Sequence, residues 1–269
     1  MKQENLNQGV TVVTGAGGGI GQAAVKGLLR EGHHVVAVVR KAHSFSAHPS
    51  LSVVEADITS ESDRLKIRSF LASRYPGITG LINNAGIGMG SIRLSYYKDK
   101  IRLDEIDSKI LNQFLSINAH APIALSLELL PLFNRSWGRI INIGTSLTAM
   151  LRPGFLPYAM SKAALESASA VMATDLQKTH ITVSILNPGG PVHTPMAKRE
   201  ESAEIKKLIS VEKMVPPLCW LASVRAQNIN GMRVNALKWD INHVPDALSP
   251  IGWPQLASDS LWENPNTSL

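Results

Sequence analysis

Tyr158 and Lys162 are two side chains whose types and spacing could carry out acid/base chemistry. In a helix, residues four apart lie on one face, so the phenol and the ammonium would be neighbours. A phenol has a pKa of about 10, and a nearby cation favours its ionised form, so Tyr158 could exchange a proton near neutral pH. The pair follows a predicted strand at 139–144, and ligands of open α/β sheets bind outside the carboxyl ends of strands.

A glycine-rich turn, TGAGGGIG, runs from Thr14 to Gly21 between a predicted strand and a predicted helix. Glycines there let the backbone turn tightly and approach a pyrophosphate, whose charge a helix N-terminus stabilises. The spacing is G-x-x-x-G-x-G rather than the G-x-G-x-x-G fingerprint of dinucleotide-binding folds. In this position the turn favours dinucleotide binding over a purely structural turn.

The elements that must position these residues alternate along the chain. Short runs of β-branched residues predict strands, and apolar residues at helical spacing predict helices. Because the strands are nearly continuous apolar runs, both faces of their sheet should be covered, as in βαβ units. The sequence therefore predicts an α/β fold: a single doubly wound Rossmann-type parallel sheet of about seven strands with helices on both faces. The predicted strands are 10–14, 34–39, 51–55, 80–83, 139–144, 182–187 and 231–236, and the predicted helices are 19–30, 61–75, 103–133, 157–178 and 211–223.

We expect one dinucleotide-binding and catalytic domain over residues 1–269. Two segments depart from the alternation: residues 88–102, expected to be an inserted loop, and residues 240–269, expected to be a loosely structured tail. We expect the tail to lie near the substrate site or a subunit contact. Three aromatic residues could form an apolar wall of the site or could instead cover a subunit contact: Tyr96, Tyr97 and Trp239.

Composition narrows the class of protein. With 269 residues, 44% of them hydrophobic and 18% charged, the chain is globular rather than disordered. The net charge is +6, but the longest basic runs are pairs at 40–41, 198–199 and 206–207, so we expect no nucleic-acid partner. One cysteine, Cys219, excludes an internal disulfide, and the histidines show no metal-ligand spacing, so we expect no bound metal. The polar N-terminus and the lack of a long apolar window predict a cytoplasmic protein with no membrane partner.

Five motifs, in a fixed order, make residues 9–236 resemble the short-chain dehydrogenase/reductase family. In that family the first motif binds the cofactor, and the second stabilises the central sheet beside the adenine ribose. The third supplies a catalytic Asn from a helix, the fourth is the catalytic centre, and the fifth holds the nicotinamide amide. In this chain the motifs are Thr14–Gly21, Asn83-Asn84-Ala85-Gly86, Asn118, Thr145 or Ser146 with Tyr158 and Lys162, and Asn187-Pro188-Gly189 with Thr194.

The resemblance implies a mechanism and a cofactor site. Tyr158 would pass a proton to or from the substrate oxygen while a hydride moves between the substrate carbon and nicotinamide. Lys162 would lower the pKa of Tyr158 and hold the ribose hydroxyls. Asn118 would reach Lys162 through a water, or alternatively satisfy a kink in its helix. Asp57 would contact adenine, or alternatively be a turn residue or helix N-cap. Cofactor contacts are implied for Thr14, Gly15, Gly19, Ile20, Gly21, Asp57, Ile58, Asn84, Ala85, Gly86, Tyr158, Lys162, Pro188, Gly189 and Thr194.

Either Thr145 or Ser146 could be the hydroxyl that polarises the substrate carbonyl. The family usually has Ser where Thr145 stands, 13 residues before Tyr158, and the 12-residue separation of Ser146 is also within the family's range. Neighbouring side chains of an extended strand point to opposite sides, so only one of the two can face the nicotinamide. We expect Thr145 to be that residue.

The second predicted strand ends in Val39-Arg40-Lys41, without an acidic residue. In dinucleotide-binding folds an acid at this place accepts the 2′-hydroxyl of NAD, whereas an Arg accommodates the 2′-phosphate of NADP. Arg40 therefore predicts a preference for NADP(H), with NAD(H) possible. The alternative is that Arg40 is only a solvated strand exit.

These features predict an NADP(H)-dependent oxidoreductase that interconverts a carbonyl and a secondary alcohol of a small molecule. Two alternatives stay open: a lyase, epimerase or isomerase on the same fold, and a non-catalytic nucleotide-sensing protein. The resemblance also implies a homo-oligomer, a dimer or a tetramer, that forms through the helices at 103–133 and 157–178.

Overall fold

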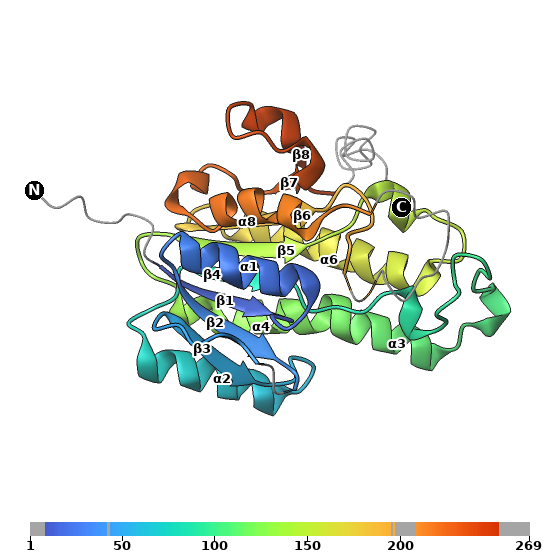
Figure 1. The fold of residues 1–269 in the computed structure, drawn as a ribbon, viewed down its shortest axis with the longest axis horizontal. Helices are drawn as coiled ribbons and strands as arrows, with labels where there is room; N and C mark the ends of the chain where they lie inside the picture. The colour runs from blue at the N-terminus through green and yellow to red at the C-terminus, as the bar shows by residue number, and fades with distance from the viewer. Residues whose placement is uncertain (1–8, 42–43, 195, 197–207, 253–269) are drawn as a thin grey trace, which may run out of the picture.

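The computed structural model describes residues 9–41, 44–194, 196 and 208–252, which form an α/β fold around one eight-stranded sheet (Figure 1). Seven neighbouring strands are parallel and the last is antiparallel, so the predicted parallel sheet is confirmed with one strand more than expected. The order across the sheet is β3 (Leu51–Glu55), β2 (His34–Val39), β1 (Val10–Thr14), β4 (Gly80–Asn83), β5 (Gly138–Ile143), β6 (Ile181–Asn187), β7 (Met232–Asn235) and β8 (Leu248–Pro250). Residues 253–269 of the predicted tail and the basic pairs at 198–199 and 206–207 lie outside the described residues.

Helices cover both faces of the sheet, as the apolar strands predict. Leu28 and Leu218 are fully buried on one face, and Leu71 and Leu125 are buried on the other. The sheet is therefore enclosed between two apolar layers. The helices of the first face are α1 (Gly19–Arg30) and α8 (Val215–Leu221), those of the second are α2 (Glu61–Arg74), α4 (Ala121–Leu129) and α6 (Leu156–Asp175), and α3 (Ser108–Leu115) and α5 (Leu147–Met150) lie beside α6.

The strand order reverses at β1, which pairs with β2 on one side and with β4 on the other. At such a point the connections leave neighbouring strands toward opposite faces, and a crevice opens at the carboxyl ends of the strands, where ligands bind. Three segments meet at this edge: the turn after β1 at 14–19, the segment after β4 at 84–86, and the loop after β5 at 144–155.

The region predicted as one helix, 103–133, is divided in the structure. α3 ends at Leu115, a π-helical turn covers Ser116–His120, and α4 begins at Ala121. Pro122 has no N–H to donate to the carbonyl four residues earlier, which is that of Asn118, so the regular hydrogen-bond pattern is interrupted. The apolar spacing continues through the break, and for this reason the sequence pattern does not reveal it.

By length and composition, Ser108–Leu132 could cross a membrane, although the sequence analysis predicts no span. In the structure, Leu125 and Leu129 of this segment are fully buried against the sheet, and α3 packs on α6. The segment therefore packs as a core helix of the α/β fold does.

Part of the predicted irregular tail, 240–269, is regular: β8 pairs with β7. Just after β8, the backbone N–H of Gly252 donates to Oε1 of Glu166 at 3.0 Å, and Nε of Arg233 donates to the same oxygen at 2.9 Å. Glu166 lies on α6 and is 1% exposed, so a buried ion pair holds the chain after β8 against the sheet. A strand of three residues carries too little alternation for the sequence to predict it.

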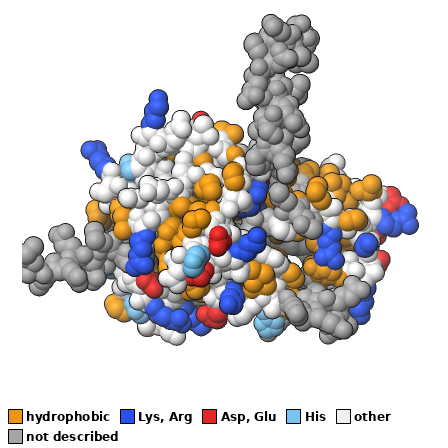
Figure 2. Space-filling view, turned by 90° about the horizontal axis from the view of Figure 1, so that it is seen from above, with side chains coloured by type: hydrophobic (Ala, Val, Ile, Leu, Met, Phe, Trp, Pro, Cys, Tyr) orange, Lys and Arg blue, Asp and Glu red, His pale blue; other side chains and the backbone are white. Residues whose placement is uncertain are grey.

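Charged side chains are dispersed on the face of the molecule that Figure 2 shows. The Lys and Arg side chains drawn there lie singly or in small groups, with acidic and hydrophobic side chains between them. On that face, the described basic side chains therefore form a mixed surface rather than a stripe.

Candidate active site

One cleft with a volume of about 1310 Å³ runs along the carboxyl ends of the strands and joins the glycine-rich turn to Tyr158. Most of the predicted site residues line it. They are Gly15, Gly19, Ile20, Arg40, Asp57, Ile58, Asn84, Ala85, Gly86, Thr145, Ser146, Tyr158, Lys162, Pro188, Gly189 and Thr194. Thr14, Gly21 and Asn118 lie behind the wall of the cleft, where they hold the lining segments in place.

Thr14 is fully buried at the end of β1 and ties the glycine-rich turn to the end of β4. Its Oγ1 accepts hydrogen bonds from the backbone N–H groups of Asn84 at 3.0 Å and Ala85 at 3.1 Å. In return, Nδ2 of Asn84 donates to the backbone oxygens of Thr14 at 3.0 Å and Gly15 at 3.1 Å. Thr14 therefore supports the turn from behind rather than facing a ligand.

The backbone of the turn requires glycine at two positions. Gly15 has a φ of +61°, and a Cβ at Gly21 would lie 2.3 Å from the backbone oxygen of Gly15. α1 then begins without a side-chain cap and without an acidic residue in its first turn. Because Gly19 and Ile20 line the cleft, the first N–H groups of α1 and the positive end of its dipole are open to an anion such as a phosphate.

Arg40 and Asp57 line the cleft beyond β2 and β3, at the end away from Tyr158. Burial acts to raise the pKa of Asp57, but hydrogen bonds from Thr59 and the charge of Arg40 outweigh it, so the pKa is lowered. Oδ1 of Asp57 accepts from the N–H of Thr59 at 2.9 Å and from its hydroxyl at 2.7 Å. Asp57 therefore orders a turn, the alternative left open by the sequence, and also faces the cleft.

Tyr158 lies in the first turn of α6 and packs against an aromatic cluster. Burial raises the pKa of Tyr158, a hydrogen bond with the Thr145 side chain acts to lower it, and the neighbouring Tyr97 acts to raise it; the net pKa is raised. This direction is opposite to the one that the spacing to Lys162 predicts, because the effect of burial dominates. A phenol with a raised pKa stays protonated at neutral pH, so Tyr158 can donate a proton.

Thr145 and Ser146 both line the cleft but use their hydroxyl groups differently. The Thr145 side chain lies close enough to the Tyr158 side chain to act on the pKa of the phenol as a hydrogen-bond partner. Oγ of Ser146 instead accepts from the backbone N–H of Ala149 at 3.2 Å, at the start of α5. This geometry favours Thr145 as the hydroxyl next to a reacting group.

Lys162 is 8% exposed and lies one helical turn after Tyr158. Its Nζ donates to the backbone oxygen of Ile143 at 2.8 Å and lies 6.0 Å from the centroid of the Tyr158 ring. Burial lowers the pKa of Lys162 to about 8. The side chain is thus fixed at the end of β5, with its amine at the wall of the cleft.

Asn118 joins three segments around the site. Its Oδ1 accepts from the N–H of Ile87 at 2.8 Å, and its Nδ2 donates to the oxygen of Ile87 at 3.0 Å and to Oγ of Ser161 at 3.0 Å. The side chain therefore connects the π-helical turn to the segment after β4 and to the residue before Lys162. Its hydrogen bonds go to these other segments and not to the backbone of its own turn.

The segment after β6 closes the cleft on the side of α1. Gly189 has a φ of +89°, and a Cβ there would lie 2.6 Å from Oδ1 of Asn235. Thr194 lies over the glycine-rich turn, since a Cβ at Gly19 would be 2.8 Å from its Cγ2. Pro188 and Gly189 thus line the same cleft as Thr194, which lies beside the start of α1.

Side chains from residues 88–97 and 149–155 form the other end of the cleft. Tyr96 and Tyr97 line it, as one of the two sequence interpretations expects. The sequence analysis missed further lining residues, among them Met89, Gln113, Leu151, Arg152 and Phe155. No periodic pattern marks them. The available signal was the position of Met89 in the inserted segment and of Leu151, Arg152 and Phe155 in the loop before Tyr158, whereas Gln113 lies on α3 and carried no such signal.

Trp239, the third residue expected in an apolar wall, lies elsewhere. Its ring contacts that of Trp220 on α8, with 5.1 Å between centroids, and it packs on the core of the α1 and α8 face. The expectation that it lines the substrate site is wrong, because the chain after β7 runs toward α8 and not toward Tyr158.

Comparisons with known proteins agree with this arrangement. The chain matches a family described as short chain dehydrogenase over residues 9–205. It is 29% identical over 189 residues to a 3-amino-tetrahydro-pyrrolizinone reductase of Xenorhabdus hominickii, covering 69% of this chain and 62% of the reductase. It is 26% identical over 247 residues to the oxidoreductase YciK of Escherichia coli K12, covering 87% and 94%. A 3-ketoacyl-(acyl-carrier-protein) reductase of Brucella melitensis, solved with NADH, superposes with a TM-score of 0.73 at 23% identity, covering 86% of this chain and 97% of that chain.

The family match begins just before β1 and extends beyond Thr194, so it contains both ends of the cleft. It covers more than half of the chain. The aligned part spans less than two thirds of the Xenorhabdus reductase but nearly all of YciK. On this evidence the chain belongs to the short-chain dehydrogenase family, a family of oxidoreductases.

Proposed function

We propose that the protein is an NADP(H)-dependent oxidoreductase that interconverts a carbonyl and a secondary alcohol, with Tyr158 as the proton donor and acceptor. The observation that carries the proposal is that Tyr158 and Thr145 line the same cleft as the uncapped start of α1. One end of this cleft suits a phosphate, and the other presents a transferable proton. Relatives of this chain include reductases of carbonyl compounds, one of them solved with NADH.

The residues present fit a nicotinamide dinucleotide. Gly15 and Gly21 allow the close backbone packing of the turn, since a Cβ at Gly15 would lie 2.8 Å from Cα of Ala85, and the first N–H groups of α1 are available to a pyrophosphate. Asp57 and Ile58 would hold the adenine end. Lys162 would hold the ribose near nicotinamide, since its amine lies at the cleft wall next to Tyr158. When bound, nicotinamide supplies or accepts the hydride.

The chain's own residues position and move the proton. Tyr158 keeps its proton on Oη at neutral pH because burial raises its pKa. Thr145 would donate a hydrogen bond to the substrate oxygen and stabilise the negative charge that develops there. Asn118 would fix the backbone around Ile87 and the helix that carries Lys162. A protonated phenol suits reduction, in which Tyr158 gives its proton to the oxygen as the carbonyl becomes an alcohol.

The preference for NADP(H) rests on Arg40. It follows β2, lines the cleft, and its charge acts on Asp57 across the adenine end. A guanidinium there pairs with a 2′-phosphate, which an acidic residue would repel. NAD(H) would bind more weakly, without this contact.

A substrate screen tests the proposed activity. Carbonyl compounds and secondary alcohols are offered with NADPH or NADP⁺, and the absorbance of reduced nicotinamide is followed together with product analysis. We expect a net change in absorbance that matches the product formed. Turnover without a net change would point to a lyase, epimerase or isomerase, and tight NADP(H) binding with no turnover of any compound would point to a nucleotide sensor.

We also propose a homo-oligomer, a dimer or a tetramer, that forms through α4 and α6. Leu127 on α4 and Val171 on α6 are 53% and 57% exposed, so apolar side chains of these helices lie on the surface. Burying such side chains against a second copy would stabilise the assembly. Light scattering after size-exclusion chromatography should give a multiple of the 29.1 kDa chain, and Leu127→Glu with Val171→Glu should reduce it; a wild-type monomer would contradict this proposal.

The proposed location is the cytoplasm, in which the free thiol of Cys219 would stay reduced. Cell fractionation checks this, and recovery of the protein outside the cytoplasmic fraction would contradict it.

A further inference from the structure

The substrate end of the cleft is an aromatic chamber formed by the inserted segment and the loop before Tyr158. Tyr96 and Phe155 are buried in one apolar cluster, and Tyr97 and Tyr158 pack against it. The ring centroids of Tyr96 and Phe155 are 5.4 Å apart, and those of Tyr97 and Phe155 are 6.0 Å apart. A chamber of this kind suits a flat, apolar substrate body.

Arg152 lies across this chamber. Its guanidinium carbon is 4.5 Å from the centroid of Tyr97 and 5.0 Å from that of Phe155, and the residue lines the cleft. Tyr97 in turn is close enough to Tyr158 to affect its pKa. Tyr97 and Tyr158 also pack against the same apolar cluster, so the guanidinium and the proposed proton donor lie beside one aromatic cluster. Stacking on a ring face orients the planar group and leaves the N–H donors at its edge available.

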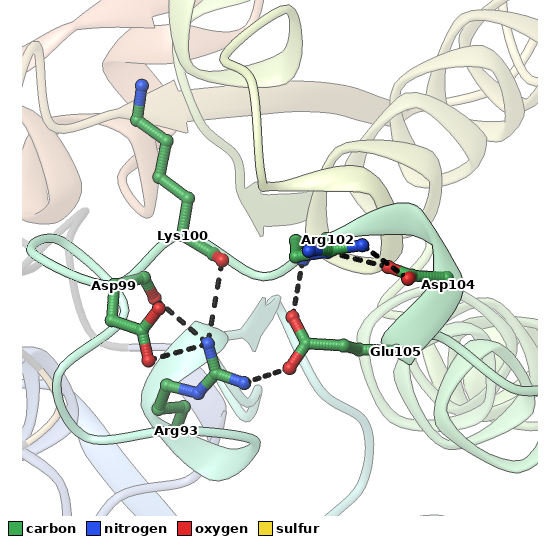
Figure 3. Close-up of polar contacts among 6 residues, drawn as sticks. All are labelled: Arg93, Asp99, Lys100, Arg102, Asp104 and Glu105. Atoms are coloured by element: carbon green, nitrogen blue, oxygen red, sulfur yellow. Dashed lines mark hydrogen bonds and ion pairs between the residues drawn. The ribbon is translucent and has the colours of Figure 1, made fainter.

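The two arginines of the neighbouring segment already have anionic partners. Arg93 forms ion pairs with Asp99 and Glu105, and Arg102 pairs with Asp104, all within one polar cluster of the segment 93–105 (Figure 3). Glu105 also accepts from the backbone N–H of Arg102 at 2.7 Å. This cluster pairs both arginines of the segment with carboxylates, whereas Lys98 and Lys100 of the same segment form no ion pair within the described residues.

Arg152 differs from these cations. In the part of the chain that the structure describes, no carboxylate forms an ion pair with it. The other charged side chains that line the cleft there are Arg40 and Asp57 at the adenine end and Lys162 at the end of β5. The substrate end of the described cleft thus presents one guanidinium without an anionic partner, stacked on the wall of an aromatic chamber.

We propose that Arg152 binds a carboxylate of the substrate, so that the substrate class is an aryl ketone that carries a carboxylate. The aromatic chamber takes the ring, Tyr158 and Thr145 take the carbonyl oxygen, and the guanidinium takes the carboxylate through charge-assisted hydrogen bonds. The inference rests on the proposed function for the position of the carbonyl. The binding of the carboxylate itself depends only on Arg152 and the chamber.

The test compares pairs of compounds that differ only in charge: para-acetylbenzoate with para-acetylbenzamide, and the meta isomers of both. Affinities for the full chain, with and without NADP⁺, are measured by calorimetry, and turnover with NADPH is measured separately. We expect the wild-type protein to bind at least one benzoate about five- to tenfold more tightly than its amide, the range of a partly exposed charged contact. Arg152→Met should remove that preference, and Arg152→Lys should keep part of it.

Arg74→Met is the matched control. Arg74 lies at the end of α2, is exposed, and stacks on Phe70 at 4.8 Å, so the substitution removes a similar contact away from the cleft. This variant should keep the wild-type preference for the benzoate. Arg152→Met should also bind NADP⁺ as the wild-type protein does.

Four results would overturn the inference: equal affinity of the wild-type protein for acid and amide, no measurable binding of either benzoate, a preference that survives Arg152→Met, or weaker NADP⁺ binding in that variant. The proposed function fails in a different way. If the benzoate preference depends on Arg152 but no carbonyl compound is reduced, the carboxylate site is supported and the proposed activity is contradicted. If acid and amide are reduced equally well, the proposed activity is supported and the carboxylate site is contradicted.

Discussion

The two ends of the cleft are made of different parts of the chain. The cofactor end is formed by backbone: Gly15 with a positive φ, Gly21 in close approach, and Thr14 and Asn84 bonded to each other's main chain. The substrate end is formed by side chains of loops, such as Tyr97 and the stacked Arg152. Backbone geometry tolerates few residue types, whereas loop side chains can change without disturbing the sheet. In the proposed function, the first end would therefore hold the cofactor and the second would select the substrate.

Tyr158→Phe should give the largest difference between an effect on turnover and an effect on cofactor binding. The ring can stay packed in the aromatic cluster while the transferable proton is lost, so turnover should fall by about 10²- to 10⁴-fold. The dissociation constant for NADPH, measured by fluorescence titration, should stay within about twofold of wild type, since the loss removes one hydroxyl and no phosphate contact. Retention of more than about a hundredth of the rate would contradict the role of Tyr158 as acid/base.

Thr145→Val, with Ser146→Ala as its matched control, sharpens the assignment at the substrate end. Removal of the Thr145 hydroxyl should lower kcat by about 10²- to 10³-fold, because one donor to the developing charge is lost. Ser146→Ala should leave kcat near wild type and cost about 1 kcal/mol of stability through the lost hydrogen bond to Ala149. The reverse pattern in steady-state assays would move the catalytic hydroxyl to Ser146.

Arg40→Asp probes the cofactor end alone. The introduced carboxylate should repel a 2′-phosphate and accept a ribose hydroxyl, shifting the ratio of NADPH to NADH affinity by about tenfold or more toward NADH. Titration of both cofactors measures this ratio, and kcat with saturating cofactor should change little. Tighter binding of NADH than NADPH by the wild-type protein would contradict the NADP(H) preference itself.

Lys162 lies between the two ends, and its burial predicts a pH dependence of stability. Its pKa falls from 10.5 to about 8 on folding, so the unfolded chain binds the extra proton between these values. The free energy of unfolding should therefore rise with pH over this range, by up to about 3 kcal/mol from this group. Urea unfolding of the cofactor-free protein is measured at pH 7 and pH 9.5 for wild type and Lys162→Met. The free energy of unfolding of the variant, relative to that of wild type, should be lower at pH 9.5 than at pH 7. A constant difference would show that the amine is not desolvated.

The same contrast explains what the sequence could reveal. The fold class, the positions of β1 to β4 and α1, and the glycine-rich turn follow from apolar runs and glycine placement, because these patterns reflect backbone requirements. The helix break at Asn118 and Pro122 could not be predicted, because the apolar spacing continues through it. Strand β8 could not be predicted because it has only three residues.

At the site, spacing brought together Tyr158 and Lys162, and the family resemblance added Thr145, but neither gave the direction of the Tyr158 pKa shift. That direction depends on burial of the phenol against the aromatic cluster and, to a smaller extent, on the charge effect of Tyr97, which comes from a distant segment. Arg152 was missed for the same reason: its partners, Tyr97 and Phe155, become neighbours only when the inserted segment folds over the loop. Contacts between loops far apart in the chain leave no periodic signal.

The central claim is that a hydride passes between nicotinamide at one end of the cleft and a substrate carbon held by Tyr158 at the other. NADPH labelled with deuterium at the transferable position on carbon 4 tests it most directly, with a carbonyl compound found active in the substrate screen. The account predicts that the deuterium appears on the carbinol carbon of the product, in one-to-one ratio with the NADP⁺ formed. A product without deuterium, with the label still on the cofactor, would contradict it.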